Sequence, residues 1–361
     1  MMATSLLLVF LKGIFVQGWL ALLFRRHSKR AWFWVLLAVD ALWAFWVLYR
    51  MRGGIVMTWR QPALFFWILT HLTLGAGATV ETLARMLPWP RFIRVTGGSL
   101  VLLGLGFSAW GLVEAYGPPR REEVQLTFPD LPPAFDGYRI LFFSDVHAGP
   151  YAGSHTLRLW ARHMADMDAD LLVGAGDFIS YWPQEAEALR EPFAAIHPRD
   201  GRVGVLGNHD RYRTSMEVSE RLEKQGWRIL TDESMAIERG GDRLLLMGIG
   251  HPEDEDPERF KPEWHPLPSG PGFRIGIVHT PVLWPQLRQV GARLSLAGHT
   301  HGGQINLDPF LNMARVNVGY VAGIYEKGPD RLFVTKGLGC TALPFRIRCR
   351  PEIVRITLRR G

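Results

Sequence analysis

The chain has 361 residues, 48% of them hydrophobic, and a mean hydropathy of +0.03, which is high for a wholly soluble enzyme. Its net charge of +7 comes from the N-terminal part, since the residues up to Glu123 include 13 basic and 5 acidic side chains against 28 and 29 in the remainder. Basic residues that separate apolar segments follow the positive-inside rule, so the charge does not indicate a nucleic-acid partner and we expect none.

Four apolar segments, each close to the roughly 20 residues that a bilayer core requires, occupy the N-terminal part. They cover residues 4–24, 31–49, 62–86 and 95–116. Clusters of Arg and Lys separate them, and tryptophans such as Trp32 and Trp59 lie near their ends, as in an interfacial aromatic belt. We therefore expect residues 1–120 to form a transmembrane helical region with about four spans. Three spans are the alternative, because Lys12 and Gln17 interrupt the first segment.

The basic residues between these segments bear on the side of the membrane on which the rest of the chain lies. The first and third gaps contain seven of them, whereas the second gap together with Arg120 and Arg121 contains five. Loops rich in Lys and Arg stay on the cytoplasmic side, so this small difference favours a non-cytoplasmic location for residues 121–361.

Short β-rich runs alternate with helical stretches after Gly117, Pro118 and Pro119, which predicts an α/β domain over residues 121–361. Strands are predicted at residues 138–144, 171–175, 202–206, 243–249, 273–278, 294–297, 331–335 and 353–358. Helices are predicted around residues 154–168, 184–196, 214–225 and 282–290. Two cysteines, Cys340 and Cys349, are too few for a disulfide framework or a cysteine-based metal site, and whether they pair is left open.

Five short polar motifs each follow directly on an apolar strand, where α/β folds collect functional groups. In chain order they are Ser144-Asp145-Val146-His147-Ala148-Gly149, Gly176-Asp177, Gly207-Asn208-His209-Asp210, His279 and Gly298-His299-Thr300-His301-Gly302-Gly303. A single such motif is weak evidence, because an Asp at a strand end is usually a helix cap and a lone His is usually a loop residue. Five in succession, all at strand ends, indicate one common site.

The side-chain types in these motifs indicate a metal centre. Carboxylate, imidazole and amide-oxygen ligands without thiolate suit Mn, Fe or Zn, and a shared Asp suits a pair of divalent ions. Two ions about 3.5–4 Å apart lower the pKa of a water between them and hold a phosphate for in-line displacement. The expected ligands are Asp145, His147, Asp177, Asn208, His279, His299 and His301.

The order of the motifs resembles the calcineurin-like metallophosphoesterase superfamily, whose blocks read D-x-H, G-D, G-N-H-[DE], H and G-H-x-H. The resemblance covers roughly residues 136–360. It extends to the YkuE/YaeI-like bacterial branch through the run from His299 to Ile305 and through a tail that contains Pro344-Phe345-Arg346 and Pro351-Glu352-Ile353. The resemblance implies a four-layer α/β/β/α sandwich and, with the apolar segments, a multi-pass protein of the bacterial inner membrane.

The same resemblance divides the ligands between two ions. It implies that one ion is held by Asp145, His147, Asp177 and His301. It implies that the other ion is held by Asp177, Asn208, His279 and His299. His209 is not needed as a ligand in this scheme and suits a general acid that protonates the leaving-group oxygen, with Asp210 orienting its imidazole.

Four further residues are candidates for contacts to the substrate. His251 follows the strand predicted at residues 243–249, and it lies in an acidic loop that is otherwise expected to be solvated. Arg211 and Tyr212 follow the third motif directly, and Tyr151 follows the first. Each of the four is a possible phosphate or leaving-group contact.

Several functions remain open at this point. We expect hydrolysis of a phosphodiester or pyrophosphate bond in a membrane-associated or lipid-linked molecule, because the enzyme domain follows closely on the apolar segments. A UDP-2,3-diacylglucosamine pyrophosphatase of lipid A synthesis is an alternative, and it requires a cytoplasmic active site. An alternative of another class is a non-catalytic metal-binding membrane interaction protein, against which the intact ligand motifs argue.

Overall fold

The computed structural model describes residues 90–211, 215–251, 270–306, 319–341 and 343–361. The chain divides into two compact units, Met1–Leu112 and Val113–Gly361. The apolar segments 4–24, 31–49 and 62–86 lie outside the described residues, and the domain boundary at residue 120 stays a prediction.

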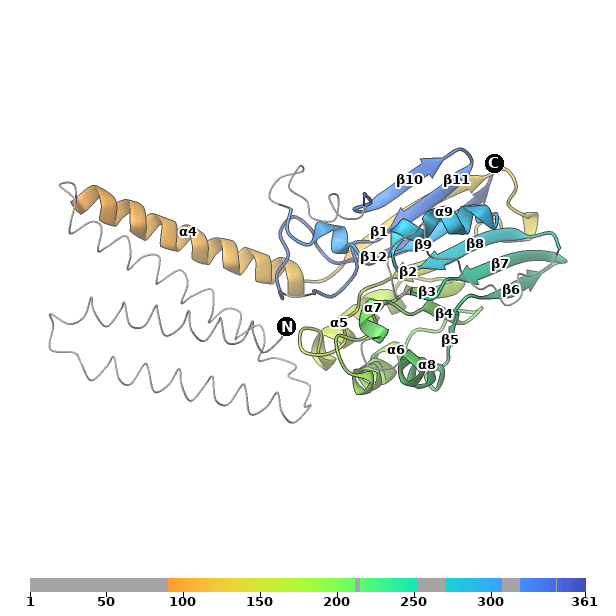
Figure 1. The fold of residues 1–361 in the computed structure, drawn as a ribbon, viewed down its shortest axis with the longest axis horizontal. Helices are drawn as coiled ribbons and strands as arrows, with labels where there is room; N and C mark the ends of the chain where they lie inside the picture. The colour runs from red at the N-terminus through yellow and green to blue at the C-terminus, as the bar shows by residue number, and fades with distance from the viewer. Residues whose placement is uncertain (1–89, 212–214, 252–269, 307–318, 342) are drawn as a thin grey trace. The chain divides into compact units, whose positions relative to one another are not determined.

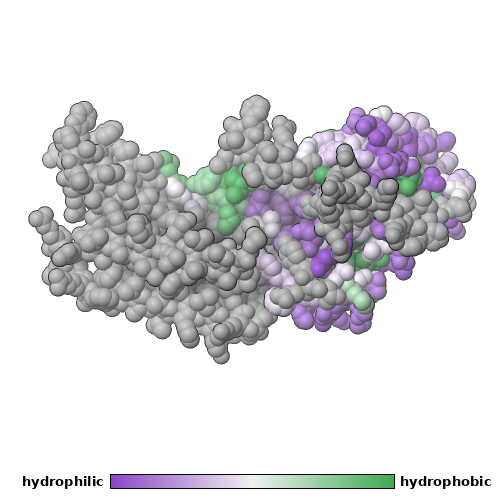
Figure 2. Space-filling model, in the orientation of Figure 1, coloured by the Kyte–Doolittle hydropathy of each residue, from purple (hydrophilic) through white to green (hydrophobic). Residues whose placement is uncertain are grey.

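The apolar segment 95–116 lies within helix α4 (Pro90–Tyr116), so its helical conformation agrees with the expectation. The described part of this helix shows a largely hydrophobic surface, green in Figure 2, and Leu102, Leu103 and Val113 are exposed. Within the part of the chain that the structure describes, however, no helix is both long and apolar enough to cross a membrane. The four membrane spans therefore stay a prediction.

Two six-stranded sheets form the framework of the second unit (Figure 1). The first sheet has the order β1 (Arg120–Phe128), β12 (Glu352–Arg360), β2 (Arg139–Phe143), β3 (Leu171–Ala175), β4 (Arg202–Val205) and β5 (Trp227–Ile229). All neighbouring pairs in it are parallel except β12 and β2. The second sheet has the order β10 (Gly323–Lys327), β11 (Asp330–Val334), β9 (Leu294–Ala297), β8 (Phe273–Val278), β7 (Asp242–Gly248) and β6 (Glu233–Arg239). Its two outer pairs are antiparallel and its inner pairs are parallel.

The core lies in three layers of apolar side chains. The largest layer lies between the two sheets and joins residues such as Ile140 and Phe142 of β2 to Ile275 and Ile277 of β8. A second layer packs the first sheet against α5 (Ser154–Ala165), α6 (Arg190–Ala194) and α8 (Ser215–Glu223). A third packs the second sheet against α9 (Trp284–Gln289). The α/β domain therefore has the helix, sheet, sheet, helix order that the sequence analysis expected (Figure 1).

Strand β2 shows why the central strands are continuous apolar runs. Its side chains alternate between the two sides of the sheet, so Ile140 and Phe142 enter the core between the sheets while Leu141 and Phe143 enter the layer beneath the helices. Because both faces of the strand are covered, the sequence does not alternate between apolar and polar residues but is apolar throughout. Short 3₁₀ helices complete the described elements: η1 (Pro133–Phe135), η2 (Pro183–Leu189), η3 (Pro281–Leu283) and η4 (His301–Gly303), together with the single-turn helix α7 (Asn208–Arg211).

Candidate metal centre

The seven expected ligands follow the carboxyl ends of five central strands. Strands β2, β3 and β4 run parallel in the first sheet, and β8 and β9 run parallel in the second. Loops after the first three strands carry Asp145, His147, Asp177 and Asn208, and loops after the other two carry His279, His299 and His301. Both sheets therefore contribute side chains to one place.

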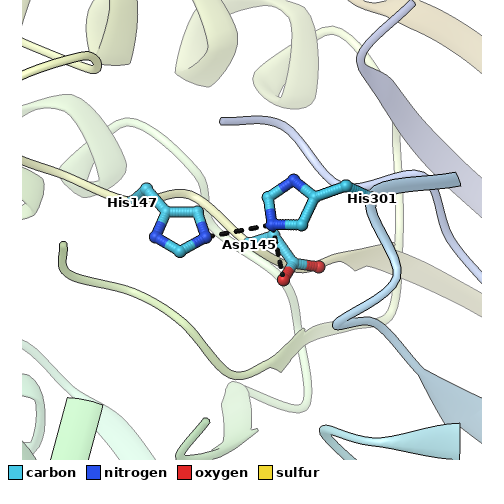
Figure 3. Close-up of side chains that lie close together, drawn as sticks. All are labelled: Asp145, His147 and His301. Carbon is cyan, nitrogen blue, oxygen red and sulfur yellow. Dashed lines mark hydrogen bonds and ion pairs between the residues drawn. The ribbon is translucent and has the colours of Figure 1, made fainter. Parts of the chain in front are cut away.

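Asp145, His147 and His301 form one group, with their polar atoms directed at one another (Figure 3). Nε2 of His147 lies 3.1 Å from Nε2 of His301, and Nε2 of His301 lies 3.4 Å from Oδ1 of Asp145. Oδ2 of Asp177 lies 3.5 Å from Nε2 of His147. All four side chains are buried. The structure thus brings together the four residues expected around one ion.

A second group adjoins the first through Asp177. Nε2 of His279 lies 3.4 Å from Oδ2 of Asp177, the same oxygen that faces His147. It also lies 3.1 Å from Oδ1 of Asn208 and 3.1 Å from Nδ1 of His299. Nδ1 of His299 in turn lies 3.2 Å from the Asn208 oxygen. The four residues expected around the other ion therefore also converge.

The spacing of these atoms is compatible with coordination of metal ions. Two ligand atoms that each lie about 2.0–2.2 Å from one ion are roughly 3.0–3.5 Å from each other at tetrahedral or octahedral angles. The contacts between His147 and His301 and between His279 and His299, at 3.1 Å each, pair ring nitrogens within this range. The residues present therefore fit two divalent ions, although their roles as ligands stay predictions.

Backbone contacts orient the ligand side chains. Nδ1 of His279 lies 2.7 Å from the carbonyl of Ala175, so this nitrogen donates its proton there and Nε2 is directed at the centre. The N–H of His209 donates to Oδ1 of Asp177 at 2.8 Å, which leaves Oδ2 for the two groups. Gly176 has a left-handed φ of 85°, and a Cβ on it would lie 2.7 Å from Nδ1 of His279, so only glycine fits this position.

The charges at the centre are strongly coupled. Burial lowers the pKa of His147 to about 3 and that of His301 to about 4, against the opposing pull of nearby carboxylates. His279 is also buried, but the Asp177 carboxylate outweighs burial and raises its pKa to about 10. Burial opposes ionisation of Asp177, yet the His279 and His147 imidazoles lower its pKa well below the usual range. In the protein without ions, His279 therefore carries a proton at neutral pH beside the ionised Asp177 carboxylate.

His209 is held by a different residue from the one expected. Its Nδ1 lies 2.7 Å from the carbonyl oxygen of Ser180, which accepts the ring proton. The Asp210 carboxylate instead accepts the N–H groups of Ile179 at 3.1 Å and Gly207 at 2.8 Å, and so it ties the loop after β3 to the loop after β4. The hydrogen bond that the structure gives to Nδ1 of His209 is thus with Ser180, and the orienting role of Asp210 stays a prediction.

Burial also raises the pKa of the Asp210 carboxyl group. Burial, with the nearby Asp177 carboxylate, raises the pKa of Asp210 to about 7.

A ring nitrogen of His209 lies close enough to His147 and Asp177 to join a further group that could hold a metal ion. A role for His209 as acid and a role as ligand thus differ in what its removal does to metal content.

The four candidate substrate contacts have different positions. The ring of His251 is buried, and its centroid lies 5.6 Å from that of His279 and 6.3 Å from that of His299, beside the second ligand group. Tyr151 is half-buried in the loop after β2, and burial raises the pKa of its hydroxyl. Arg211 ends helix α7, whereas Tyr212 lies outside the described residues.

Sequence reasoning missed one residue that contacts the centre. Arg346 is fully buried, and its Nη2 lies 3.3 Å from Nδ1 of His301. The tail motif Pro344-Phe345-Arg346 included it without a role, because its partners are backbone carbonyls that no residue type in the sequence reveals. Cys340 and Cys349, near Arg346, are both free and buried.

The fold and the grouped Asp and His side chains are those of a protein that could bind metal ions, and comparisons with known proteins agree. Residues 138–303 match the family described as calcineurin-like phosphoesterase. The chain is 29% identical over 245 residues to the uncharacterized metallophosphoesterase YkuE of Bacillus subtilis, covering 63% of this chain and 82% of YkuE. It is 25% identical over 234 residues to the phosphodiesterase YaeI of Escherichia coli, covering 61% of this chain and 82% of YaeI.

Residues 138–303 therefore form a domain similar to calcineurin-like phosphoesterases, and the similarity to YkuE and YaeI agrees with the expected bacterial branch. The chain is also 28% identical over 269 residues to a Danio rerio protein named "Transmembrane protein with metallophosphoesterase domain", covering 70% of this chain. The chain spans 60% of the length of that relative and 61% of a Bos taurus protein of the same name.

Proposed function

We propose that the chain hydrolyses a phosphodiester or pyrophosphate bond with two divalent ions, Mn, Fe or Zn. One observation carries this proposal: Oδ2 of Asp177 faces Nε2 of His147 at 3.5 Å and Nε2 of His279 at 3.4 Å. A single carboxylate oxygen directed at two groups of ligands is an arrangement that suits a pair of ions. Such ions supply a water of lowered pKa and neutralise the charge on the phosphate.

The chain's own residues supply the remaining chemistry. The Ser180 carbonyl accepts the Nδ1 proton of His209, so the proton available for the leaving-group oxygen is the one on Nε2. The hydroxyl oxygen of Thr341 lies 3.4 Å from Nε2, the ring nitrogen that does not contact Ser180. His251 lies beside the second ligand group and Tyr151 lies in the loop that follows the first ligand motif, and both are candidates to contact a phosphate or its leaving group.

Replacing the shared carboxylate tests the class of function. With bis(p-nitrophenyl) phosphate and added Mn²⁺, we expect Asp177→Asn to lower turnover by at least ~100-fold, because the oxygen that joins the two ligand groups loses its charge. Asp166→Asn is the matched control, since that carboxylate lies on the surface in an ion pair with Arg121. No turnover by the wild type above the uncatalysed rate would favour the non-catalytic metal-binding alternative, whereas wild-type turnover in Asp177→Asn would show that the activity does not depend on this carboxylate.

Removing the imidazole of His209 separates its two possible roles. We expect His209→Ala or His209→Asn to retain both metal ions and to lower turnover by roughly 10²–10⁴-fold, the usual contribution of a general acid. Metal content is measured by elemental analysis of the purified full-length protein. Loss of one ion would show that His209 is a ligand, and wild-type turnover would remove it from the mechanism.

We further propose that the substrate is membrane-associated, with a lipid-linked phosphoester as the natural form, and that the chain is a multi-pass protein of the bacterial inner membrane. Support comes from the four apolar segments before residue 117 and from the word "transmembrane" in the name of the Danio rerio relative. The small excess of basic residues in the first and third gaps favours a non-cytoplasmic active site. A UDP-2,3-diacylglucosamine pyrophosphatase would need the cytoplasmic side.

A further inference from the structure

A buried carboxylate lies beneath the loop that holds His209. Glu185 is 2% exposed and lies in η2, and its Oε2 accepts the backbone N–H groups of three successive residues. The distances are 3.0 Å from Ser180, 2.8 Å from Tyr181 and 3.1 Å from Trp182. A carboxylate that receives three N–H groups fixes the course of the backbone through all three residues.

Glu185 also has little freedom to move. Gly149 packs against it, and a Cβ at that position would lie 2.7 Å from Oε1. The loop that it holds is attached to the first ligand motif as well, since the N–H of Ser180 donates to the carbonyl of Ala148 at 3.0 Å and the Ser180 hydroxyl donates to the carbonyl of His147 at 2.9 Å. The position of Ser180 is therefore defined from two sides.

Ser180 connects this carboxylate to the expected acid. Its N–H is bound by Glu185, and its carbonyl accepts the Nδ1 proton of His209 at 2.7 Å. The peptide that follows Ser180 carries both this carbonyl and the N–H of Tyr181, which donates to Glu185. Because a peptide unit is planar, an N–H held by Glu185 fixes the direction in which the Ser180 carbonyl points.

We propose that Glu185 is a positioning residue for His209, which it aligns through the peptide between Ser180 and Tyr181. The proposal rests on the proposed function, since it takes His209 to be the general acid. Glu185 itself touches neither substrate nor the expected ligands of the ions. Its removal turns the carbonyl, and with it the imidazole, away from the leaving-group oxygen.

Three backbone N–H groups favour the charged form of Glu185. Burial is the larger effect and raises its pKa, while the three N–H groups and the nearby His209 lower it in part. A neutral Gln at this position keeps the size of the side chain but weakens the three hydrogen bonds, because bonds to a charged acceptor are roughly twice as strong as neutral ones. The substitution Glu185→Gln thus loosens the loop without creating a cavity.

The test compares two esters that differ only in the leaving group. Ethyl p-nitrophenyl phosphate has a leaving group that departs without a proton, whereas ethyl phenyl phosphate needs an acid. In the full-length protein with Mn²⁺, we expect Glu185→Gln to lower kcat roughly tenfold or more for the phenyl ester and less than about threefold for the p-nitrophenyl ester. KM and metal content should not change. Glu187→Gln is the matched control, because Glu187 lies in the same 3₁₀ helix but forms surface ion pairs with Arg190 and Arg221.

His209→Ala supplies the reference for both hypotheses. It should show the same dependence on the leaving group as Glu185→Gln, and the double variant should be no slower than His209→Ala alone, because both changes remove one function. Glu185→Asp, which keeps the charge but retracts it by one methylene, should show the same dependence and serves if Glu185→Gln does not fold.

Two kinds of failure are distinguishable. If His209→Ala shows the dependence but the Glu185 variants match the wild type, or lose both esters equally, the positioning role is wrong while the proposed function stands. If the wild type hydrolyses neither ester, or His209→Ala shows no dependence on the leaving group, the proposed acid is wrong and the positioning role fails with it.

Discussion

The backbone at the centre has an unusual conformation, residue by residue. Among the described residues, eight residues other than glycine have positive φ, and five of these are expected ligands: Asp145, His147, Asp177, His299 and His301. A side chain in the left-handed region costs about 1–3 kcal/mol, so such residues persist only where the surroundings impose them. The ligand loops are therefore selected for the direction of their side chains rather than for local stability.

The proton on His279 predicts how ion binding depends on pH. Asp177 raises the pKa of His279 to about 10, so this imidazole is protonated at neutral pH, whereas a metal ion requires the neutral ring. Binding of Mn²⁺ at pH 7 should release this proton, and affinity should rise about tenfold per pH unit until pH approaches the pKa. His147 and His301, with pKa values of about 3 and 4, release none.

Calorimetry checks this prediction in the full-length protein. Titration of Mn²⁺ in two buffers with different heats of ionisation gives the number of protons released, which should be at least one at pH 7. Equal binding heats in both buffers would contradict a protonated His279.

At the scale of elements, the sequence identified all eight central strands and missed four others. The four missed strands are β1, β5, β6 and β10, which are the edges of the two sheets. Edge strands are partly solvated, so their patterns are polar: β1 buries only Leu126 and Phe128 among nine residues, and β10 buries none of its five. An apolar run thus predicts a strand that is covered on both faces. An edge strand has no such run, because its formation depends on pairing with a neighbouring strand.

The conformation of the segment after β11 depends on the buried side chain of Arg346. The Arg346 guanidinium donates to the carbonyls of Gly337, Gly339 and Cys349. Arg346→Met should remove its hydrogen bonds to all three buried carbonyls, of which, among the described residues, only that of Gly337 keeps another donor, the N–H of Glu352, and lower stability by about 3 kcal/mol or more. For a domain of this size that is roughly 6–12 °C in the unfolding midpoint.

A thermal unfolding measurement on the metal-free full-length protein tests this expectation. Arg348→Met is the matched control, because Arg348 lies two residues away with an exposed side chain, and its loss should cost less than about 0.5 kcal/mol. Equal midpoints for the two variants would mean that Arg346 does not organise the segment.

At the scale of the whole molecule, the side of the membrane decides the available substrates. A reporter fused at Gly361, active only outside the cytoplasm, should be active if the basic residues orient the chain as proposed. A second reporter, active only in the cytoplasm, is the complement. Activity of the second alone would contradict the proposed side and admit the cytoplasmic pyrophosphatase alternative.

The sequence by itself determined the types and order of the metal-centre residues, because each follows an apolar strand whose pattern is local. It also determined the class of fold, since buried parallel strands need apolar residues on both faces. Only the tertiary structure decided how the side chains are held and which atoms face each other. The shared oxygen of Asp177 and the contact of Ser180 with His209 depend on backbone atoms of separate loops, and ring orientation follows hydrogen bonds that no spacing in the sequence encodes.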